Sequence, residues 1–437
     1  MRKPLAATDR KPSPPPPLRL VSITAVAFSG LHLQRGQFAY LRDHGIEVIA
    51  IASPGKELQR IADREGIEVV SVPIAREIHP LQDAISLFRL WRVLRRLRPD
   101  IVNAGTPKAG LIGMVAALLA GVPMRIYTQR GLRLETCYGL KSVLLTWTER
   151  IACFCAHRVL FVSRSLQSAC LDRKLLHASK GVVIGDGSSN GVISERFQSP
   201  ELLSSSRRLK ASLCIPDDAP VIGFVGRFTR DKGIAELCSA FAQLRHQHPT
   251  ARLLLVGDFE SGDPVDRDTV NTLREDPNVI ITGFVEDSSA YYPLMTVLAF
   301  PSYREGFPNV PLEAASAGIP AVGFKVTGTV DAIQHLITGI LVAPQDVTAF
   351  ASALERYLRN PQLRLLHGEQ ARKRAEKDFA PQRIWDGLLE LYRSEGGRQS
   401  ISRRTSDSNS LSSNISGQNE APPQSPEIVP STGKKAA

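Results

Sequence analysis

Short apolar runs rich in β-branched residues alternate along the chain with segments whose apolar residues recur every three or four positions. The first pattern predicts buried strands, and the second predicts helices that cover a sheet. In the first half we expect strands over residues 18–27, 46–52, 67–72, 100–103, 125–128 and 158–162, with helices near 56–65, 81–98, 108–120, 139–156 and 164–175. In the second half we expect strands over 221–225, 252–256, 279–281 and 297–300.

This repetition of strand and helix, without hairpin turns, predicts parallel sheets covered by helices on both faces. Two such series predict an α/β protein with two doubly wound, Rossmann-like domains, which we place at residues 18–199 and 200–380. The boundary falls in the Ser- and Pro-containing stretch 199–216. Ligands of open α/β sheets bind at the carboxyl ends of the strands, so the cleft between the domains is the expected site.

Composition supports a folded protein with two tails. The chain has 437 residues, of which 43% are hydrophobic and 22% charged, and this excludes a fully disordered, collagen-like or coiled-coil protein. Residues 1–17 are rich in proline and residues 397–437 in serine, so we expect both tails to be disordered. The six cysteines are too scattered for a disulfide framework and predict reduced thiols, as in a cytoplasm.

Charge is unevenly distributed. Residues 1–190 carry 27 Lys and Arg against 14 Asp and Glu, whereas the net charge of the whole chain is +11. A basic first half predicts an anionic partner there, and nucleic acid, an acidic bilayer and a phosphorylated substrate all fit. The longest apolar stretch, 109–124, contains three glycines and is too short to span a bilayer. We expect no secretory signal, because prolines and Arg19 stand where its apolar core would begin.

One motif whose residues could bind a ligand or act in catalysis is PSYREGFPNVPLE, at residues 301–313. It follows an expected strand, and a helix begins near Asn309, so the free amides of Asn309 and Val310 can hold a phosphate oxygen. Glu305 and Glu313 flank this position and can accept hydrogen bonds from the hydroxyl groups of a sugar and a ribose. Taken alone, these two acids fit an ordinary solvated loop and helix equally well.

A second motif is GFVGRFTRDKG, at residues 223–233. Gly226 follows the strand and allows a ligand to approach the backbone closely. Arg227 and Lys232 place two cations beside the same sheet edge, which suits a diphosphate. The alternative is that both are solvated loop residues. That alternative weakens because both motifs follow strands of one domain and converge on one crevice.

The GR-x4-KG and E-x7-E pair resembles the retaining nucleotide-sugar glycosyltransferases of family 4, which have the two-domain GT-B fold. Further stretches that support the resemblance are LLLVGD, TGFVED, GTVDAI and TGILVAP in the second half, and NAGTPKAGLIG, RGLRLETCYGLK, VLFVSRSL and GSSNGV in the first. The first-half stretches resemble a bacterial branch that builds surface polysaccharides. The resemblance covers about residues 18–396, and in this fold we expect a last helix, 381–396, to cross back and pack on the first domain.

The resemblance implies roles for individual residues. Arg227 and Lys232 match the residues that bind the donor diphosphate, Glu305 matches the acid facing the donor sugar, and Glu313 matches the acid that holds the ribose. The expected catalytic residues are Glu305, Arg227 and Lys232. The expected donor-binding residues are Gly226, Arg227, Lys232, Gly283, Phe284, Val285, Glu305, Gly306, Phe307, Asn309, Val310 and Glu313. Pro308 stands where many members have glycine and removes one amide donor.

The chain departs from the family in the loop after the fourth expected strand. Many members carry a histidine there, whereas this loop reads NAGTPK at residues 103–108. Gly36, Lys108, Gln129 and Arg130 are the residues expected on the acceptor side. The structural alternatives are that Lys108 begins a helix and that Arg130 pairs with Glu135 or Glu149.

Two other features carry open interpretations. The helix near 81–98 has five arginines with Phe88 and Trp91, and it fits a sheet-covering helix with a solvated basic face, a membrane-facing helix, or both. Asp266 and Asp268 have the spacing of a metal-binding pair, but they lie in a polar loop away from the phosphate motifs, and solvated acids are the expected interpretation. We expect neither a metal nor another cofactor.

The predicted function is that of a retaining glycosyltransferase. It would transfer a sugar from a nucleoside diphosphate sugar, expected to be a UDP sugar, to a lipid-linked or saccharide acceptor in bacterial surface polysaccharide synthesis. We expect no nucleic-acid partner, and we expect a cytoplasmic protein, with peripheral contact to an anionic inner membrane face left open. The alternatives are a nucleotide-sugar epimerase of the same fold and a catalytically inactive scaffold.

Overall fold

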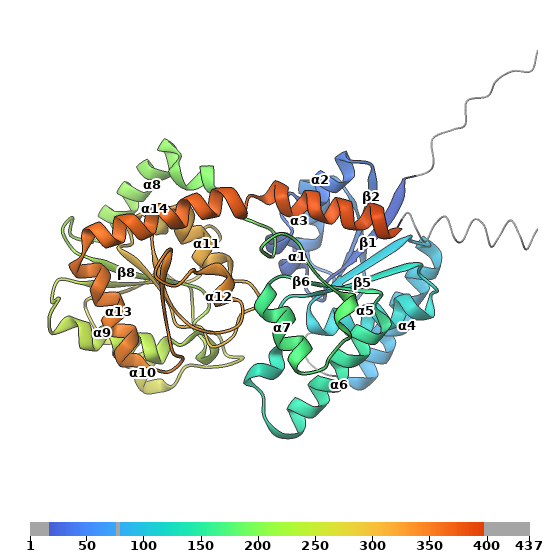
Figure 1. Cartoon of the computed structure of the whole chain (residues 1–437), viewed down its shortest axis with the longest axis horizontal. Helices are drawn as coiled ribbons and strands as arrows, with labels where there is room; N and C mark the ends of the chain where they lie inside the picture. The colour runs from blue at the N-terminus through green and yellow to red at the C-terminus, as the bar shows by residue number, and fades with distance from the viewer. Residues whose placement is uncertain (1–16, 76–78, 397–437) are drawn as a thin grey trace, which may run out of the picture.

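A computed structural model describes residues 17–75 and 79–396. Nearly all of the two predicted tails, 1–17 and 397–437, lies outside the described residues. The described chain forms two lobes, each built around its own parallel sheet (Figure 1).

The first sheet has seven parallel strands in the order β3-β2-β1-β4-β5-β6-β7. Their bounds are β1 Leu18–Ile23, β2 Ile46–Ala52, β3 Glu68–Ser71, β4 Ile101–Gly105, β5 Met124–Gln129, β6 Arg158–Phe161 and β7 Gly181–Val183. The helices of this lobe are α1 Ala27–Leu33, α2 Gln37–Asp43, α3 Lys56–Glu65, α4 Pro80–Leu97, α5 Pro107–Leu119, α6 Gly139–Cys155 and α7 Arg164–Asp172. Alternate strand residues pack against α1–α3 on one face and α4–α7 on the other, as expected for a doubly wound sheet.

The second sheet has six strands in the order β10-β9-β8-β11-β12-β13. Their bounds are β8 Val221–Val225, β9 Arg252–Val256, β10 Val279–Ile281, β11 Val297–Phe300, β12 Ala321–Phe324 and β13 Gly339–Val342. The helices are α8 Pro200–Ser212, α9 Ile234–Arg245, α10 Arg267–Glu275, α11 Asn309–Ser316, α12 Thr329–Ala332, α13 Val347–Arg359 and α14 Pro361–Asp378. In both sheets every pairing is parallel, which confirms the predicted fold class.

Two expectations differ from the structure in the kind of element, and not only in its bounds by one or two residues. The strand expected over 18–27 ends at Ile23, and Ala27 begins α1, because the apolar residues after the strand serve a short helix instead. The stretch 199–216, expected as a break, contains α8. The Ser199 side chain caps this helix by accepting from the Leu202 amide, and Pro200 stands at its first position.

Residues 381–396 form a helix that lies over the first lobe (Figure 1). Ile384, Leu388 and Tyr392 are buried in the same cluster as residues of β1, β4 and β5. The Tyr392 hydroxyl accepts from Asn103 Nδ2 at 2.7 Å, and Trp385 Nε1 donates to Asn190 Oδ1 at 2.8 Å. The chain therefore crosses between the lobes a second time after α14.

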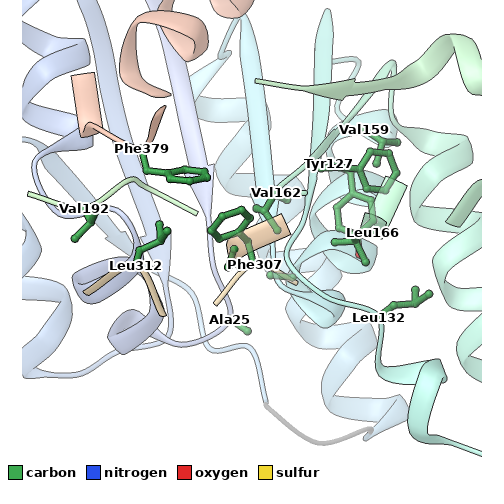
Figure 2. Packing of buried hydrophobic residues seen from close by; sticks show 14 of the residues in the cluster. Ala25, Tyr127, Leu132, Val159, Val162, Leu166, Val192, Phe307, Leu312 and Phe379 are labelled. Carbon is green, nitrogen blue, oxygen red and sulfur yellow. The ribbon is translucent and has the colours of Figure 1, made fainter. Parts of the chain in front are cut away.

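One apolar cluster runs through both lobes. It contains Val162 from the first lobe and Phe307, Leu312 and Phe379 from the second, and Figure 2 shows these side chains gathered between them. The rings of Phe307 and Phe379 lie 5.3 Å apart. Continuous burial of this kind favours a defined arrangement of the two lobes, because separating them would expose apolar surface to water.

Candidate active site

Both motifs lie at the carboxyl ends of β8 and β11, which are neighbours in the second sheet. The strand order reverses at this pair, and a crevice forms where such a reversal occurs. The loop after β8 approaches the loop after β11 closely: the Tyr303 amide donates to the Asp231 carbonyl at 2.9 Å. Gly233 has a φ of +70°, and a Cβ there would lie 2.1 Å from the Pro301 carbonyl oxygen. Glycine is therefore required where the loops meet.

Lys232 and Glu305 form an ion pair between these loops. Lys232 Nζ lies 2.5 Å from Glu305 Oε1, and the side chains are 18% and 15% exposed. The buried Ser302 hydroxyl donates to the same oxygen at 2.8 Å. Two predicted catalytic residues, 73 positions apart in the sequence, are thus in direct contact.

Asp231 and Arg304 support the same two loops. Arg304 Nη2 lies 3.2 Å from Asp231 Oδ2, and the Thr229 hydroxyl donates to Asp231 Oδ1 at 2.6 Å. Burial disfavours the charged form of Asp231, but the hydroxyl of Thr229 and the cations Lys232 and Arg304 outweigh it, so the pKa of this carboxyl lies below its usual value. The backbone around Lys232 is therefore fixed by a charged cross-link.

Arg227 lies beside the same strand end and is half exposed. Its guanidinium pairs with Glu260, in the loop after β9. Gly226 is held to the neighbouring strand, where its amide donates to the Val256 carbonyl at 3.0 Å. Glu260 is not evident from the sequence, because nothing in the motif points to a partner 33 positions away.

Helix α11 begins at Asn309, with Pro308 as its N-cap. The amides of its first turn are free of intrahelical partners and follow the carboxyl end of β11, so they can hold an anion there. Asn309 Oδ1 is buried and has no hydrogen-bond partner among the described residues. The Phe307 ring packs between the lobes against Phe379, so in this residue the backbone, and not the side chain, is available to a ligand.

Glu313 lies one turn into α11 and is partly covered. The Tyr292 hydroxyl donates to its Oε2 at 2.5 Å. Burial raises the pKa of the Glu313 carboxyl, and the Tyr292 hydrogen bond and Arg196 only partly offset this. Tyr292 is a second partner that neither motif reveals.

The predicted turn 283–285 lies after β10, beyond β9 as seen from β8. Gly283 has a φ of +72° and bridges to Gly257, and the Phe284 side chain is 69% exposed. The structure therefore places this turn at the same end of the sheet as the two motifs, two strands away from β8.

The residues predicted for the acceptor side occupy different surroundings. Gly36 begins α2 and faces the Trp385 ring, where a Cβ would lie 2.9 Å from the indole. Lys108 lies in the first turn of α5, and its Nζ is 2.7 Å from Asp83 Oδ1. Gln129 is buried, accepts from the Tyr127 hydroxyl at 2.7 Å and donates to Glu149 Oε2 at 3.1 Å.

Arg130 is the predicted acceptor-side residue that reaches the lobe interface. Its carbonyl lies against Gly306, where a Cβ would be 2.0 Å from the oxygen. Its guanidinium lines a cavity of about 20 Å³ with Gln34, Asn103 and Ser189, and donates to the Ser189 carbonyl at 3.4 Å. No acid pairs with it within the described part of the chain, and burial lowers the pKa of the guanidinium to about 10. A buried cation without an acid favours an anionic ligand.

Hydrogen bonds join the two lobes beside these residues. The Ser163 hydroxyl donates to the Gly306 carbonyl at 2.7 Å, and Thr327 Oγ1 donates to Glu135 Oε1 at 2.7 Å. Ser165 contacts Asp331 through its hydroxyl, which also accepts from the Gly328 amide at 2.8 Å. The loop that carries Glu305 is therefore held partly by the first lobe.

Of the pair Asp266 and Asp268, expected in a polar loop, Asp266 is the N-cap of α10 and Asp268 lies in the first turn of that helix. Asp266 caps α10, where Oδ1 accepts from the Thr269 amide at 2.8 Å and Oδ2 accepts from the Thr269 hydroxyl at 2.8 Å. These hydrogen bonds lower the pKa of the Asp266 carboxyl. Across residues 17–75 and 79–396, no three His, Cys, Asp or Glu side chains gather as metal ligands.

The buried Glu149 beside Gln129 predicts a pH-dependent stability. Burial raises the pKa of its carboxyl to about 7, although Tyr127 and Gln129 oppose the shift. The folded state therefore holds this proton more tightly than the unfolded state, and the stability contribution falls as pH rises from about 4.5 to 7. We expect Glu149→Gln to raise the free energy of unfolding by roughly 3 kcal/mol at pH 8.

Urea unfolding of both proteins at pH 4.5 and pH 8 would measure this effect. The gain from Glu149→Gln should be largest at pH 8 and small at the lower pH. An equal gain at the two pH values would contradict a titrating carboxyl at this position.

Comparison with known proteins agrees with this architecture. Residues 219–360 match a family model described as "Glycosyl transferases group 1", and residues 34–187 match one described as "Glycosyl transferase 4-like domain". HepE (Alr3699) of Anabaena, whose structures hold UDP and UDP-glucose, superposes with a TM-score of 0.70 at 20% identity over 86% of this chain and 100% of HepE. That likeness shows the shared fold.

Two curated relatives align along most of the chain. The capsular polysaccharide biosynthesis glycosyltransferase CapM of Staphylococcus aureus is 38% identical over 360 residues, which are 82% of this chain and 93% of CapM. The UDP-Gal:α-D-GlcNAc-diphosphoundecaprenol α-1,3-galactosyltransferase of Escherichia coli is 25% identical over 361 residues, 82% of this chain and 91% of that enzyme. The fold, the two matched domains and the identity to CapM together show that this chain is a glycosyltransferase and belongs to the group 1 glycosyl transferases, family 4.

Proposed function

We propose that this glycosyltransferase moves a sugar from a UDP sugar to a lipid-linked diphosphate saccharide during surface polysaccharide synthesis, with retention of configuration. The observation that carries the proposal is the Lys232–Glu305 pair at the β8/β11 crevice, beside the start of α11. The relatives support the substrates, since CapM is named for capsular polysaccharide and the E. coli enzyme for UDP-galactose and a diphosphoundecaprenol acceptor.

The donor diphosphate would lie between Arg227, Lys232 and the first amides of α11. Negative charge builds on the leaving phosphate as its bond to the anomeric carbon breaks, and these groups stabilise it without having to reorganise. When phosphate binds Lys232, Glu305 gives up part of its ion pair and becomes available to the sugar. Glu313 would hold the ribose through the oxygen that Tyr292 leaves free.

The acceptor would approach from the first lobe. Its hydroxyl oxygen forms the new bond to the anomeric carbon, the bond from that carbon to the phosphate oxygen breaks, and the proton passes to the leaving phosphate. Because the loop 103–108 has no histidine, this phosphate is the base we assign. Attack from the side of the leaving group retains the configuration. Arg130 would contact a phosphate of the acceptor or donor, and the lack of a paired acid among the described residues supports this role.

A donor screen tests the proposal. We expect UDP release from one UDP sugar that depends on an added bacterial lipid extract containing diphosphate-linked saccharides. Two results would contradict the proposal. They are activity only with donors that carry a nucleoside other than uridine, and no nucleoside diphosphate release with any donor. Incubating the UDP sugar without acceptor separates the epimerase alternative, because an epimerase would convert the sugar; the named relatives do not favour that alternative.

A further inference from the structure

Helix α6 exposes an apolar face to solvent. Large apolar side chains recur every three or four positions along it and are mostly uncovered: Leu140, Val143, Leu144, Trp147, Ile151 and Phe154. Leu140 is 89% exposed and Phe154 79%, while Ala152 and Cys153 on the other side of the helix are buried. The inner face of α6 packs on the first lobe, whereas its outer apolar face is open to water. An exposed apolar face of this kind indicates that a partner covers it. We call these six residues the α6 stripe.

The neighbouring helices extend the same kind of surface. Helix α5 contacts both α4 and α6, and it exposes Leu118 and Leu119 near its end. Helix α4 buries Leu90 and Leu94 against the sheet and exposes Leu81, Ile85 and Phe88. Figure 1 shows the three helices together on the side of the first lobe away from the helix 381–396.

Charge on this surface has one sign. Helices α4, α5 and α6 contain seven Lys and Arg against two acids, Asp83 and Glu149. Asp83 pairs with Lys108, and Glu149 is buried beside Tyr127. Lys141 and the arginines of α4 are exposed. Arg150 and Lys180 are half-buried and lie over the rings of Trp147 and Phe154, and Lys180 Nζ also donates to the last carbonyls of α6. Exposed cations around apolar and aromatic side chains suit the headgroup region of an anionic bilayer.

This charge pattern argues against a second copy of the chain as the occupant. In a two-fold contact the same surface meets itself, so the cations of one copy would face those of the other. A neutral protein partner would leave the cations without a counterion. An anionic bilayer instead supplies both acyl chains for the stripe and phosphates for the exposed cations of this surface.

The α6 stripe begins close along the chain to the segment that lines the interface between the lobes. The chain leads from Arg130, whose carbonyl touches Gly306, through the 3₁₀ turn Arg133–Thr136 to the start of α6. Glu135 in that turn accepts a hydrogen bond from Thr327 of the second lobe. Leu140, the most exposed residue of the stripe, therefore follows directly after the segment that lines the lobe interface.

We propose that the α6 stripe, together with the exposed basic residues of α4 and α6, docks the first lobe on an anionic lipid bilayer. No helix in the described ranges has the length and apolar content needed to cross a bilayer, so this contact lies at the interface. Delivery of a membrane-held acceptor to the crevice rests on the proposed function, whereas the docking itself does not.

Vesicle flotation with the full chain tests the docking surface. With vesicles containing phosphatidylglycerol we expect the wild type to float, and we expect the triple variant Leu140→Ser, Trp147→Ser, Phe154→Ser to lose at least about ten-fold in its partition coefficient. The variant Leu365→Ser, Leu366→Ser removes two comparably exposed leucines from α14 and should float like the wild type. Neutral phosphatidylcholine vesicles should bind the wild type more weakly.

Several outcomes would overturn the proposal. They are a wild type that stays unbound with anionic vesicles, a triple variant that floats as well as the wild type, and a concentration-dependent dimer in sedimentation that the triple variant abolishes. The single variant Leu140→Glu, at the exposed first turn of α6, gives a second test if the triple variant folds poorly. Calorimetric titration with UDP is run in parallel. Flotation without UDP binding would contradict the proposed function and leave the docking intact.

Discussion

Replacing Glu305 by glutamine is expected to lower kcat by about 10²–10³-fold while leaving the fold intact. The carboxylate lies 2.5 Å from Lys232 and accepts from Ser302, so it is held at the crevice with its charge directed there. Positive charge develops on the sugar ring as the donor bond breaks, and an amide stabilises it far less than a carboxylate. Initial rates of UDP release at saturating donor would measure the effect.

The matched control is Glu355→Gln. Glu355 also belongs to an ion pair, with Arg359 on α13, but it lies away from both motif loops. Thermal melting of the two variants should be similar. Near-normal turnover of Glu305→Gln with an intact melting curve would remove Glu305 from the reaction and would undermine the proposed mechanism.

Replacing Arg227 by alanine is expected to lower kcat/KM for the donor by about 10²-fold. Its guanidinium is 51% exposed and pairs with Glu260, so it contributes little to folding and is available to a phosphate. Arg227→Lys should recover part of the activity, because lysine keeps the charge but loses the two parallel hydrogen bonds of the guanidinium. Kinetics and UDP titration calorimetry on the three proteins would separate binding from turnover.

Arg230→Ala provides the control from the same loop. Arg230 is 69% exposed and pairs with Asp263, so it has similar charge and exposure but faces a different partner. We expect its activity to stay within a few-fold of the wild type. Equal losses for Arg227→Ala and Arg230→Ala would point to the general positive potential of the loop and against a specific contact at Arg227.

Much of the fold followed from apolar patterning alone. The strands β2, β8, β9, β10 and β11 have the bounds expected from the sequence, because each is a mainly apolar run bounded by polar or turn residues. The expectation failed after Ile23, where an apolar run continues into α1 and hydrophobicity alone cannot separate strand from helix. It also failed at α8, although Ser199 and Pro200 are ordinary signals of a helix start.

Some residues of the candidate site were expected from the sequence and others were not. Strand ends placed Arg227, Lys232 and Glu305 at one edge of a sheet, and the contact between Lys232 and Glu305 agrees with that placement. Their roles in substrate binding stay predictions. Glu260, Tyr292 and Ser163 were missed because each reaches the site from a distant segment, through contacts that only the packed chain defines. For Gln129 the pattern gave a strand end but not the face, and its side chain points into the core beside Glu149.

The hydrogen bonds from α7 to the second lobe have a kinetic consequence. Ser163 grips the carbonyl of Gly306, next to Glu305, and Ser165 holds Gly328 and Asp331. If the nucleotide binds where we propose, UDP can leave the site only after these hydrogen bonds break. Separation of the lobes, and not sugar transfer, would then limit the rate of the catalytic cycle. Weakening the hydrogen bonds between α7 and the second lobe would speed UDP release but would expose the reacting groups to water.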